Sequence, residues 1–285
     1  MNRSFAKLLI FLIFSLAFFL FFLPAKADTS VNKIIKILLV PGHDNQVWGA
    51  QYGNTKEADM TLAVATEIYN ILKLDKRFDV HITRDKNGYT KEFADYFPAQ
   101  KDAILTFEQS AKKVILNKIS KGSFIQKINT PHHKVTEDIA LRLYGFNKWA
   151  NENGIDAVIH VHFNDYPLPN KWSIGQYKGF AVYMPDTQFT NAKESAKLAT
   201  DIFTQLHKKY SPSNYKQEKG GLVSDQKLIA IGAYGTLSAS VRSVLIEYSY
   251  IYEKMFRVKS TRLEAYQNMA NLTATGIENY FFPNK

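Results

Sequence analysis

The sequence predicts an α/β protein: a single domain with a twisted, mostly parallel sheet flanked by helices, preceded by a signal peptide. Short runs of apolar and β-branched residues, typical of buried strands, alternate with longer segments whose apolar residues recur at helical spacing. Of the 285 residues, 46% are hydrophobic and 22% are charged, a globular composition that excludes collagen-like and disordered chains. The absence of cysteine excludes disulfide frameworks, zinc–thiolate clusters and cysteine nucleophiles. Any metal site must therefore be built from histidine and carboxylate side chains.

The beginning of the chain has the pattern of a secretory signal peptide. Arg3 and Lys7 give it a cationic start, residues 8–23 are almost entirely apolar, and Ala25-Lys26-Ala27 supplies small residues for cleavage after residue 27. A retained N-terminal anchor is the alternative, because the apolar run is only slightly shorter than the roughly 17 residues that cross a bilayer. In either case we expect residues 28–285 to be exported to the periplasm, the cell wall or the outside. No second apolar run of this kind follows, so we expect no stable membrane insertion after cleavage.

The first strands and helices follow this leader. Residues 34–40 (I-I-K-I-L-L-V) form a short apolar run typical of a buried parallel strand. Residues 57–73 carry apolar residues at helical spacing, and residues 79–84 (D-V-H-I-T-R) alternate like a strand. Residues 86–131 break this rhythm, because they are polar and mixed, with a helix expected near residues 103–119. We interpret them as an insertion over the sheet edge or the functional site, since structureless loops of that length are uncommon in compact domains.

The alternation continues through the second half of the chain. Gly154 follows one helical pattern as a stop signal, and Thr190 or Asn191 can cap the start of another. Strands are expected at residues 157–163, 179–184 and 241–247, and helices at residues 136–153, 192–210 and 261–280.

Reactive side chains stand where several of these strands end. In an open α/β sheet, ligands bind at the carboxyl ends of the strands. His43 directly follows the first strand, and Glu247 ends a later one. In V-I-H-V-H-F-N, the period of two places His160 and His162 together on one face and the apolar residues on the other. Imidazoles and a carboxylate from separate strands can therefore converge on one crevice.

Each of these residues also has a structural interpretation. His43 can be a turn residue beside glycine, the two strand histidines can be half-buried packing residues, and Glu247 can be a strand-end charge that faces water. Glu57 opens a predicted helix, and its spacing from Asn54 matches a capping box. Their joint placement favours a functional site, because a buried carboxylate or imidazole needs a partner to offset its desolvation.

Four motifs, in order along the chain, resemble the zinc-dependent N-acetylmuramoyl-L-alanine amidases, the type 3 peptidoglycan amidases. The resemblance covers most of the chain after the leader. The motifs are P-G-H-D-N-Q-V-W-G-A (residues 41–50) followed by Glu57, V-H-I-T-R-D (80–85), D-A-V-I-H-V-H-F-N (156–164) and V-L-I-E (244–247).

The resemblance implies a catalytic zinc ion, Zn2+, bound by His43, Glu57 and His162, with Glu247 as the catalytic carboxylate. It also implies that the enzyme hydrolyses the amide bond between N-acetylmuramic acid and L-alanine in peptidoglycan. A set of two histidines and one glutamate leaves an open tetrahedral position for water, as catalytic zinc requires. His160 stands where the family has serine.

The sequence also departs from the family pattern. Asp44 stands where a second glycine usually follows Gly-His, and residues 248–251 (Y-S-Y-I) replace the usual Thr-Gly-Phe segment. The insertion at residues 86–131 can be a lid, an autoinhibitory element or a docking surface for a regulatory protein. These changes lie around the rim of the expected site and bear on the preference for the stem peptide.

Two alternatives to the amidase remain from the sequence. One is another exported zinc peptidase such as a carboxypeptidase, against which the missing H-x-x-E pair counts. The other is a non-catalytic module that binds the cell envelope, against which the presence of all four site residues counts. The net charge of +10 comes from scattered lysines and arginines, so with export expected we predict no nucleic-acid partner.

Overall fold

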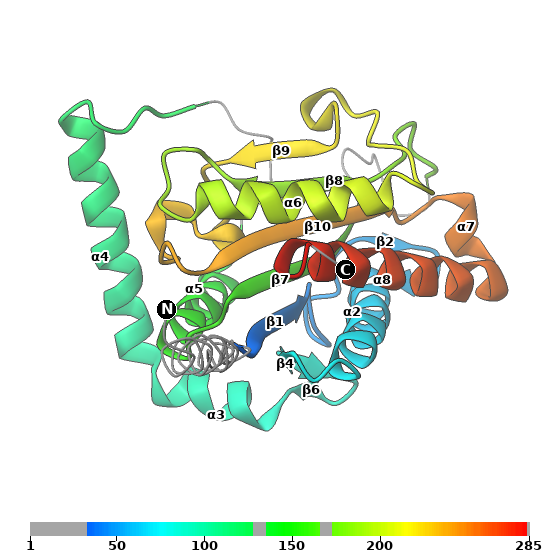
Figure 1. Ribbon diagram of the computed structural model, residues 1–285, viewed down its shortest axis with the longest axis horizontal. Coiled ribbons are helices and arrows are strands. Elements are labelled where there is room, and N and C mark those ends of the chain that lie inside the picture. Colours follow the sequence, from blue (N-terminus) through cyan, green and yellow to red (C-terminus); the bar gives the residue numbers. More distant parts are fainter. Residues whose placement is uncertain (1–32, 128–134, 166–172, 284–285) are drawn as a thin grey trace, which may run out of the picture. The chain divides into compact units, whose positions relative to one another are not determined.

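A six-stranded sheet forms the centre of the fold (Figure 1). The computed structural model describes residues 33–127, 135–165 and 173–283, and residues 34–285 form one compact unit. The expected signal peptide lies outside the described residues. In spatial order the strands are β4 (Phe78–Ile82), β1 (Ile35–Pro41), β7 (Ala157–Asn164), β10 (Arg242–Tyr250), β8 (Ala181–Pro185) and β9 (Leu222–Asp225).

Most of this sheet is parallel, as predicted. β4, β1, β7 and β10 run parallel to one another. β8 pairs antiparallel with β10, and β9 pairs parallel with β8. β9 was not predicted from the sequence, because its four residues (L-V-S-D) bury only alternate side chains and lack the apolar run of a central strand.

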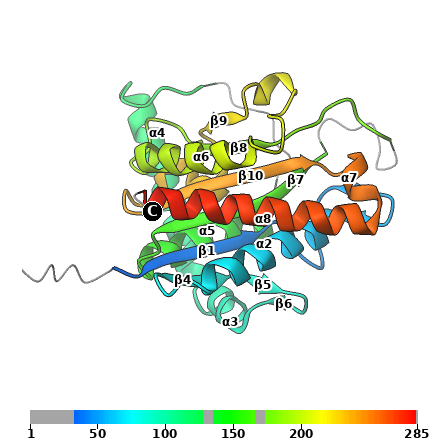
Figure 2. The ribbon, with the colours of Figure 1, turned by 45° about the vertical axis from the view of Figure 1, so that its right-hand side comes forward.

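Three helices cover one face of the sheet (Figure 2). Their buried apolar side chains share one core with the strands, and Ile159, Val161 and Phe163 of β7 all point into it. The predicted apolar face of this strand is therefore confirmed. Two of the helices lie as predicted, and the third ends at Leu206 rather than Tyr210. The helices are α2 (Glu57–Lys73), α6 (Ala192–Leu206) and α8 (Lys259–Phe281).

The opposite face is covered by a helix that was predicted and by part of the insertion. Phe93 and Phe97 from the insertion pack with Phe146 and Trp149 in a second core. The helix expected within the insertion is confirmed as α4. The preceding helix, α3, was not predicted, because it is short and contains a proline near its end. These helices are α3 (Lys91–Ala99), α4 (Lys101–Ser120) and α5 (Glu137–Glu152).

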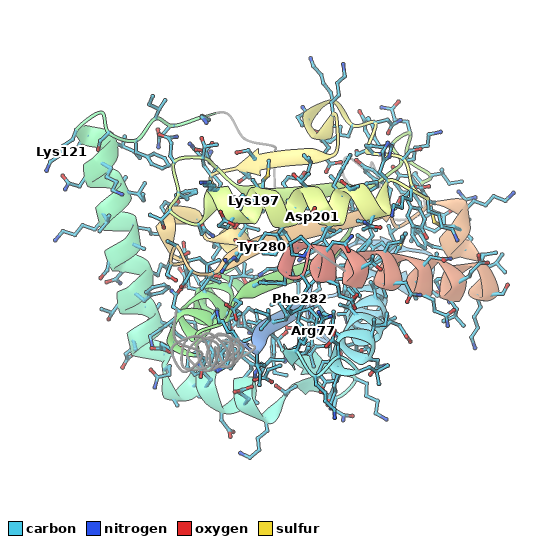
Figure 3. The ribbon with its side chains drawn as sticks, in the orientation of Figure 1. Arg77, Lys121, Lys197, Asp201, Tyr280 and Phe282 are labelled. Atoms are coloured by element: carbon cyan, nitrogen blue, oxygen red, sulfur yellow. The ribbon has the colours of Figure 1, made fainter. Side chains whose placement is uncertain are left out.

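Shorter elements complete the domain. Near the end of α8, the Phe282 ring lies 5.5 Å from the Phe78 ring, and the Arg77 guanidinium lies 3.7 Å from the Phe282 ring centre (Figure 3). Among the described residues, no helix has the length and apolar character needed to cross a membrane. The short elements are β2 (Gln51–Tyr52), β3 (Thr55–Lys56), β5 (Arg84–Asp85), β6 (Gly88–Tyr89), α7 (Lys254–Arg257) and the 3-10 turns η1 (Lys216–Glu218), η2 (Ile229–Ile231) and η3 (Ala233–Gly235).

The topology opens a crevice between β1 and β7. From β1 the chain passes through α2 to β4 on one side, and it returns through α5 to β7 on the other side of β1. The helices of these two connections lie on opposite faces of the sheet. Such a switch point leaves the carboxyl ends of the two strands uncovered, and ligands bind there in open α/β sheets.

Candidate functional site

Three of the residues singled out from the sequence come together at this switch point. His43 follows β1, Glu57 is the first residue of α2, and His162 lies near the end of β7. Each side chain offers one ligand atom, and these atoms all lie within 4.8 Å of one another. His43 Nε2 is 3.0 Å from Glu57 Oε2, and His162 Nδ1 is 3.1 Å from Glu57 Oε1. The two imidazole rings lie edge to face, with their centres 5.3 Å apart.

The carboxylate of Glu57 belongs to this cluster and not to a helix cap. The helix begins at Glu57, so its N-cap is Lys56, and the spacing from Asn54 has no capping role. The backbone N–H of Ala50 donates to Glu57 Oε2 at 2.8 Å, and that of Phe163 donates to Oε1 at 3.1 Å. The capping-box interpretation is therefore wrong, because the carboxylate points back towards the sheet.

Glycines leave the space that this cluster occupies. A Cβ atom added at Gly42 would lie 2.4 Å from His162 Cε1. A Cβ atom added at Gly49 would lie 2.4 Å from both Glu57 Oε2 and His43 Cδ2, and Gly49 has a φ of +70°. His43 itself has a φ of 61°, a left-handed conformation that is uncommon for a residue with a side chain. The loop is thus held in a strained form that brings the imidazole over the strand ends.

A buried arginine fixes this loop. The side chain of Arg84 is almost fully buried, and its Nη2 donates to the carbonyl of Gly42 at 3.0 Å and to that of Ala58 at 2.7 Å. The hydroxyl of Thr61 also donates to the carbonyl of Gly42, at 2.7 Å. These bonds tie the end of β1 to the first turn of α2. This role of Arg84 was not predicted from the sequence, because the burial of its side chain depends on elements far apart in the chain.

Asp44, at the position where the family has glycine, caps the same loop. Its Oδ1 accepts the backbone N–H groups of Gln46 and Val47, each at 2.8 Å, and its Oδ2 pairs with Arg142 of α5. Burial alone would raise the pKa of Asp44, but these backbone donors and the Arg142 charge hold it below its ordinary value. The departure from the family pattern therefore adds a link between the His43 loop and α5.

Burial and the neighbouring charges shift the pKa values of all three side chains. Burial would raise the pKa of Glu57, but the adjacent His43 and His162 hold it well below its ordinary value. Burial lowers the pKa of His162 below its ordinary value despite the neighbouring carboxylate. Burial would lower the pKa of His43, but the adjacent Glu57 carboxylate outweighs burial and raises this pKa above its ordinary value. An ionised carboxylate and imidazoles are the forms that bind a divalent metal ion, so the chemistry of this donor set fits one.

Glu247, the predicted catalytic residue, lies beside this cluster. It is paired in register with His162 across β10 and β7. Among the described residues, its Oε2 is buried and has no hydrogen-bond partner. Burial, followed by the charges of Glu57, Glu218 and Asp165, raises the pKa of Glu247 well above its ordinary value. An unpaired buried acceptor costs roughly 1–3 kcal/mol, and a bound cation nearby would relieve both that cost and the repulsion.

Two cavities meet at the cluster of His43, Glu57 and His162, and His43 and His162 line both. The first, of about 760 Å³, is called here the Glu247 cavity. The second, of about 550 Å³, is called the His160 cavity. Residues that line only the Glu247 cavity include Glu57, Asn164, Asp165, Tyr183, Glu218 and Glu247. Residues that line only the His160 cavity include Val40, Tyr89, Arg142, Phe146, His160 and Ala230.

A further buried carboxylate in the Glu247 cavity, Glu218, was not predicted from the sequence. Glu218 Oε1 accepts hydrogen bonds from Asn164 Nδ2 and from the Tyr183 hydroxyl, both at 2.7 Å. Its Oε2 accepts from the Ser213 hydroxyl at 2.5 Å and from the Tyr250 hydroxyl at 2.9 Å. Four donors offset the desolvation of this carboxylate. In the sequence Glu218 lies in a polar Q-E-K-G-G segment, which carries no signal of burial.

His160 shares the strand face of His162 but not its partners. It is buried, and neither of its ring nitrogens has a hydrogen-bond partner among the described residues. Burial, followed by the nearby His162, lowers the pKa of His160 to about 3, although the neighbouring backbone of Ala230 acts in the opposite direction. The imidazole is therefore neutral. His132 and His133, the other paired histidines of the sequence, lie outside the described residues.

Comparisons with known proteins give the same answer as the motifs. The sequence profile of the N-acetylmuramoyl-L-alanine amidase family matches residues 37–279. A search of curated protein sequences gives no significant match.

Several solved structures share the fold. The CwlD amidase from Clostridioides difficile, solved in complex with the GerS lipoprotein, aligns with a TM-score of 0.55 and 13% identity, over 88% of this chain and 100% of that one. The apo form of the amidase Ami1 from Mycobacterium abscessus aligns with a TM-score of 0.55 and 14% identity, over 87% and 99% of the two chains. Because the family profile spans most of the sequence, the chain belongs to the N-acetylmuramoyl-L-alanine amidase family and is a peptidoglycan amidase.

Proposed function

We propose that the enzyme is zinc-dependent, that His43, Glu57 and His162 hold the ion, and that Glu247 is the catalytic carboxylate. The observation that carries this proposal is the convergence of the three ligand atoms within 4.8 Å, next to a buried and unpaired Glu247 oxygen. The glycines at positions 42 and 49 support it, because any side chain there would collide with the cluster.

The mechanism follows from where these groups lie. When bound, zinc would act as a Lewis acid towards the carbonyl of the scissile amide and would make a water molecule more acidic. Glu247, whose pKa burial raises, is suited to accept a proton from the attacking water. It would then deliver this proton to the departing amine of L-alanine, because an amide nitrogen leaves only as a neutral amine. Glu57 stays ionised beside the two imidazoles, which is the form in which it would hold the ion.

We further propose that residues 1–27 are a signal peptide that exports the catalytic domain at residues 28–285. Peptidoglycan lies outside the cytoplasmic membrane, so the substrate of the family supports export. The insertion at residues 86–131 is proposed as a docking surface for a regulatory protein. Leu105, Val114 and Leu116 on α4 expose apolar side chains, as does Ile125 after it.

The test combines product analysis with metal analysis of two variants. The full chain is incubated with purified peptidoglycan, with and without a chelator, and the fragments are weighed by mass spectrometry. Stem peptides with a free L-alanine amine, released only without chelator, are expected. Loss of a single C-terminal residue would instead identify a carboxypeptidase, and no release in the presence of zinc would contradict the amidase.

The variants separate metal binding from proton transfer. We expect His43→Ala to purify without stoichiometric zinc and to be inactive. We expect Glu247→Gln to keep its zinc while the turnover rate falls by about 10²- to 10⁴-fold, the range for a lost general base. Full zinc retention in His43→Ala would overturn the ligand assignment, and near-normal turnover in Glu247→Gln would overturn the catalytic one.

A further inference from the structure

Glu218 is a buried carboxylate to which the proposed mechanism gives no role. It is the last residue of η1 and lines the Glu247 cavity. Its backbone is held on both sides, because its N–H donates to the carbonyl of Tyr215 at 2.9 Å and its carbonyl accepts the N–H of Gly221 at 2.8 Å. The carbonyl of Gly221 in turn accepts the N–H of Val182 in β8 at 2.7 Å. The carboxylate is therefore presented from a turn that is fixed to the sheet.

The four donors to Glu218 divide into two pairs. Asn164 and Tyr183 line the cavity, and their side chains donate to the same oxygen, Oε1. Ser213 and Tyr250 do not line it, and their hydroxyls donate to Oε2. A carboxylate accepts about four hydrogen bonds, so the four donors fill both oxygens. Glu218 thus orients its neighbours and has no acceptor site left for a ligand.

Glu218 also links two strands directly beyond the proposed site. β7 and β10 pair His162 with Glu247. Their register then shifts, and Asn164 pairs with Tyr250. Backbone pairing is disrupted at such an irregularity, so side-chain bonds are needed to fix the strands there. Both residues of this last pair donate to Glu218. Tyr250 belongs to the Y-S-Y-I segment that departs from the family pattern, so the link is a feature of this chain.

The position of Glu247 indicates which part of the substrate meets this wall. In the proposed mechanism its proton goes to the departing amine, so the peptide that carries this amine extends into the Glu247 cavity. Asn164 and Tyr183 are two polar side chains of that cavity, and Glu218 fixes both. Side chains that are ordered before the ligand arrives lose less conformational freedom on binding. Glu218 can therefore strengthen binding without touching the substrate.

Resting on the proposed function, we infer that Glu218 is a positioning residue for the stem peptide, acting through Asn164 and Tyr183 in the wall of the Glu247 cavity. Contacts that are equal in the bound substrate and in the transition state change KM and leave kcat nearly unchanged. The effect of Glu218 should therefore appear in KM. It should also depend on how much peptide the substrate carries, because a single residue next to the scissile amide reaches less of the wall.

Two substrates of different peptide length test the inference. One is N-acetylmuramoyl-L-alanine, and the other carries the full stem peptide on the same sugar. Glu218→Leu keeps a side chain of similar size that accepts no hydrogen bond. We expect it to raise KM for the longer substrate by about 10-fold, equivalent to roughly one hydrogen bond, with kcat and zinc content unchanged. The shorter substrate should be cleaved as by the wild type. Equal losses on both substrates, or no loss on either, would overturn the inference.

The conservative variant Glu218→Gln separates hydrogen bonding from charge. Its amide oxygen can still accept from Asn164 and Tyr183, while its NH₂ group can donate to the two hydroxyls on the other side. We expect Glu218→Gln to keep most of the wild-type affinity for the longer substrate. A KM as high as that of Glu218→Leu would contradict a role that acts through hydrogen bonds.

Tyr250→Phe tests the same role from outside the cavity, and it decides the question if Glu218→Leu does not fold. It removes one hydroxyl that donates to Glu218 and should raise KM for the longer substrate by roughly 2- to 10-fold, the range for one hydrogen bond. Tyr248→Phe is the matched control on the same strand. The Tyr248 hydroxyl lies 2.6 Å from that of Thr273, and Tyr248 lines neither cavity, so KM should not change. The same KM in both variants would overturn the inference.

A titration with the released stem peptide reports on the wall without catalysis. Calorimetry should give a higher Kd for Tyr250→Phe than for the wild type or Tyr248→Phe, and equal Kd values in all three would overturn the inference. If the wild type cleaved neither substrate, the amidase mechanism would be contradicted, and this titration would still decide the role of Glu218. If the wild type cleaved both substrates and Tyr250→Phe behaved like it, the amidase would stand and the role of Glu218 would not.

Discussion

At the scale of single residues, the site depends on two glycines that leave room for the clustered side chains as much as on those side chains themselves. His43, Glu57 and His162 can approach one another only because two neighbouring residues have no side chain. Gly42 faces the His162 ring, and Gly49 faces both other ligands. The strained backbone of His43 is in turn held by hydrogen bonds to the carbonyl of Gly42. Small residues that take no part in chemistry therefore set the positions of those that do.

We predict that Gly49→Ala reduces metal affinity by about 10- to 100-fold, the range for lost support of a ligand. The added Cβ would displace Glu57 Oε2 and His43 Cδ2, and its left-handed φ adds a strain of roughly 1–2 kcal/mol. The measurements are zinc titration against a competing chelator and denaturant unfolding. Gly122→Ala is the control, because Gly122 has a φ of +68° and open space around its Cβ position. Equal metal affinity in both variants would contradict the role of Gly49.

At the scale of elements, the end of the insertion is anchored to the end of β8, the strand next to the edge of the sheet. The ammonium group of Lys127 is 2.7 Å from the Oδ2 atom of Asp186, which directly follows β8. Burial alone would raise the pKa of Asp186, but Lys127 and the hydrogen bonds from Gln188 lower it from 3.8 to about 2. Because the folded pKa lies below the unfolded one, this carboxylate stabilises the fold above about pH 4, and the stabilisation is lost as the pH falls towards 2.

We therefore predict that Lys127→Ala destabilises the protein at pH 7 by on the order of 1 kcal/mol, a modest value because the ammonium group is half exposed. The free energies of unfolding of the variant and the wild type should converge as the pH falls from about 4 to about 2. The measurement is denaturant unfolding across this range. Lys121→Ala, at the exposed end of α4 (Figure 3), is the control and should leave stability unchanged at every pH. A constant difference at all pH values would contradict the ion pair.

At the scale of the whole molecule, the proposed metal site joins parts that are distant in the sequence. The proposed ligands come from the loop after β1, from α2 and from β7, and Glu247 comes from β10. Arg84 and Asp44 extend these links to β5 and to α5. A bound ion would therefore stabilise the folded domain as a unit, because the ligand set does not exist in the unfolded chain.

We predict that zinc raises the melting temperature of the full chain. A free concentration 100-fold above Kd contributes about 2.7 kcal/mol. For a domain of this size that corresponds to a rise of roughly 5–10 °C. Calorimetry with and without chelator measures the rise, and His43→Ala should show none. If the melting temperature of the wild type were the same with and without zinc, this would contradict a metal site that spans these elements.

The sequence by itself determined the α/β class, most strands and helices, and the four residues of the proposed site. Buried parallel strands need continuous apolar runs, helices show their spacing, and His43, His162 and Glu247 stand at strand ends in a recognisable order. These signals are local, so they can be read without coordinates. The short strand β9 and the helix α3 were not predicted, because their local sequence patterns are weak.

Only the tertiary structure decided what surrounds those residues. In the folded chain Glu57 contacts both histidines and does not cap a helix. Arg84 and Glu218 are buried. The ring nitrogens of His160 have no hydrogen-bond partner in the described part of the chain. The physical reason is that burial and hydrogen bonding depend on segments more than a hundred residues apart. The Glu57–His162 contact, for example, spans 105 positions. A local sequence pattern cannot predict the free energy of burial and hydrogen bonding, because this free energy arises only when such distant segments pack together.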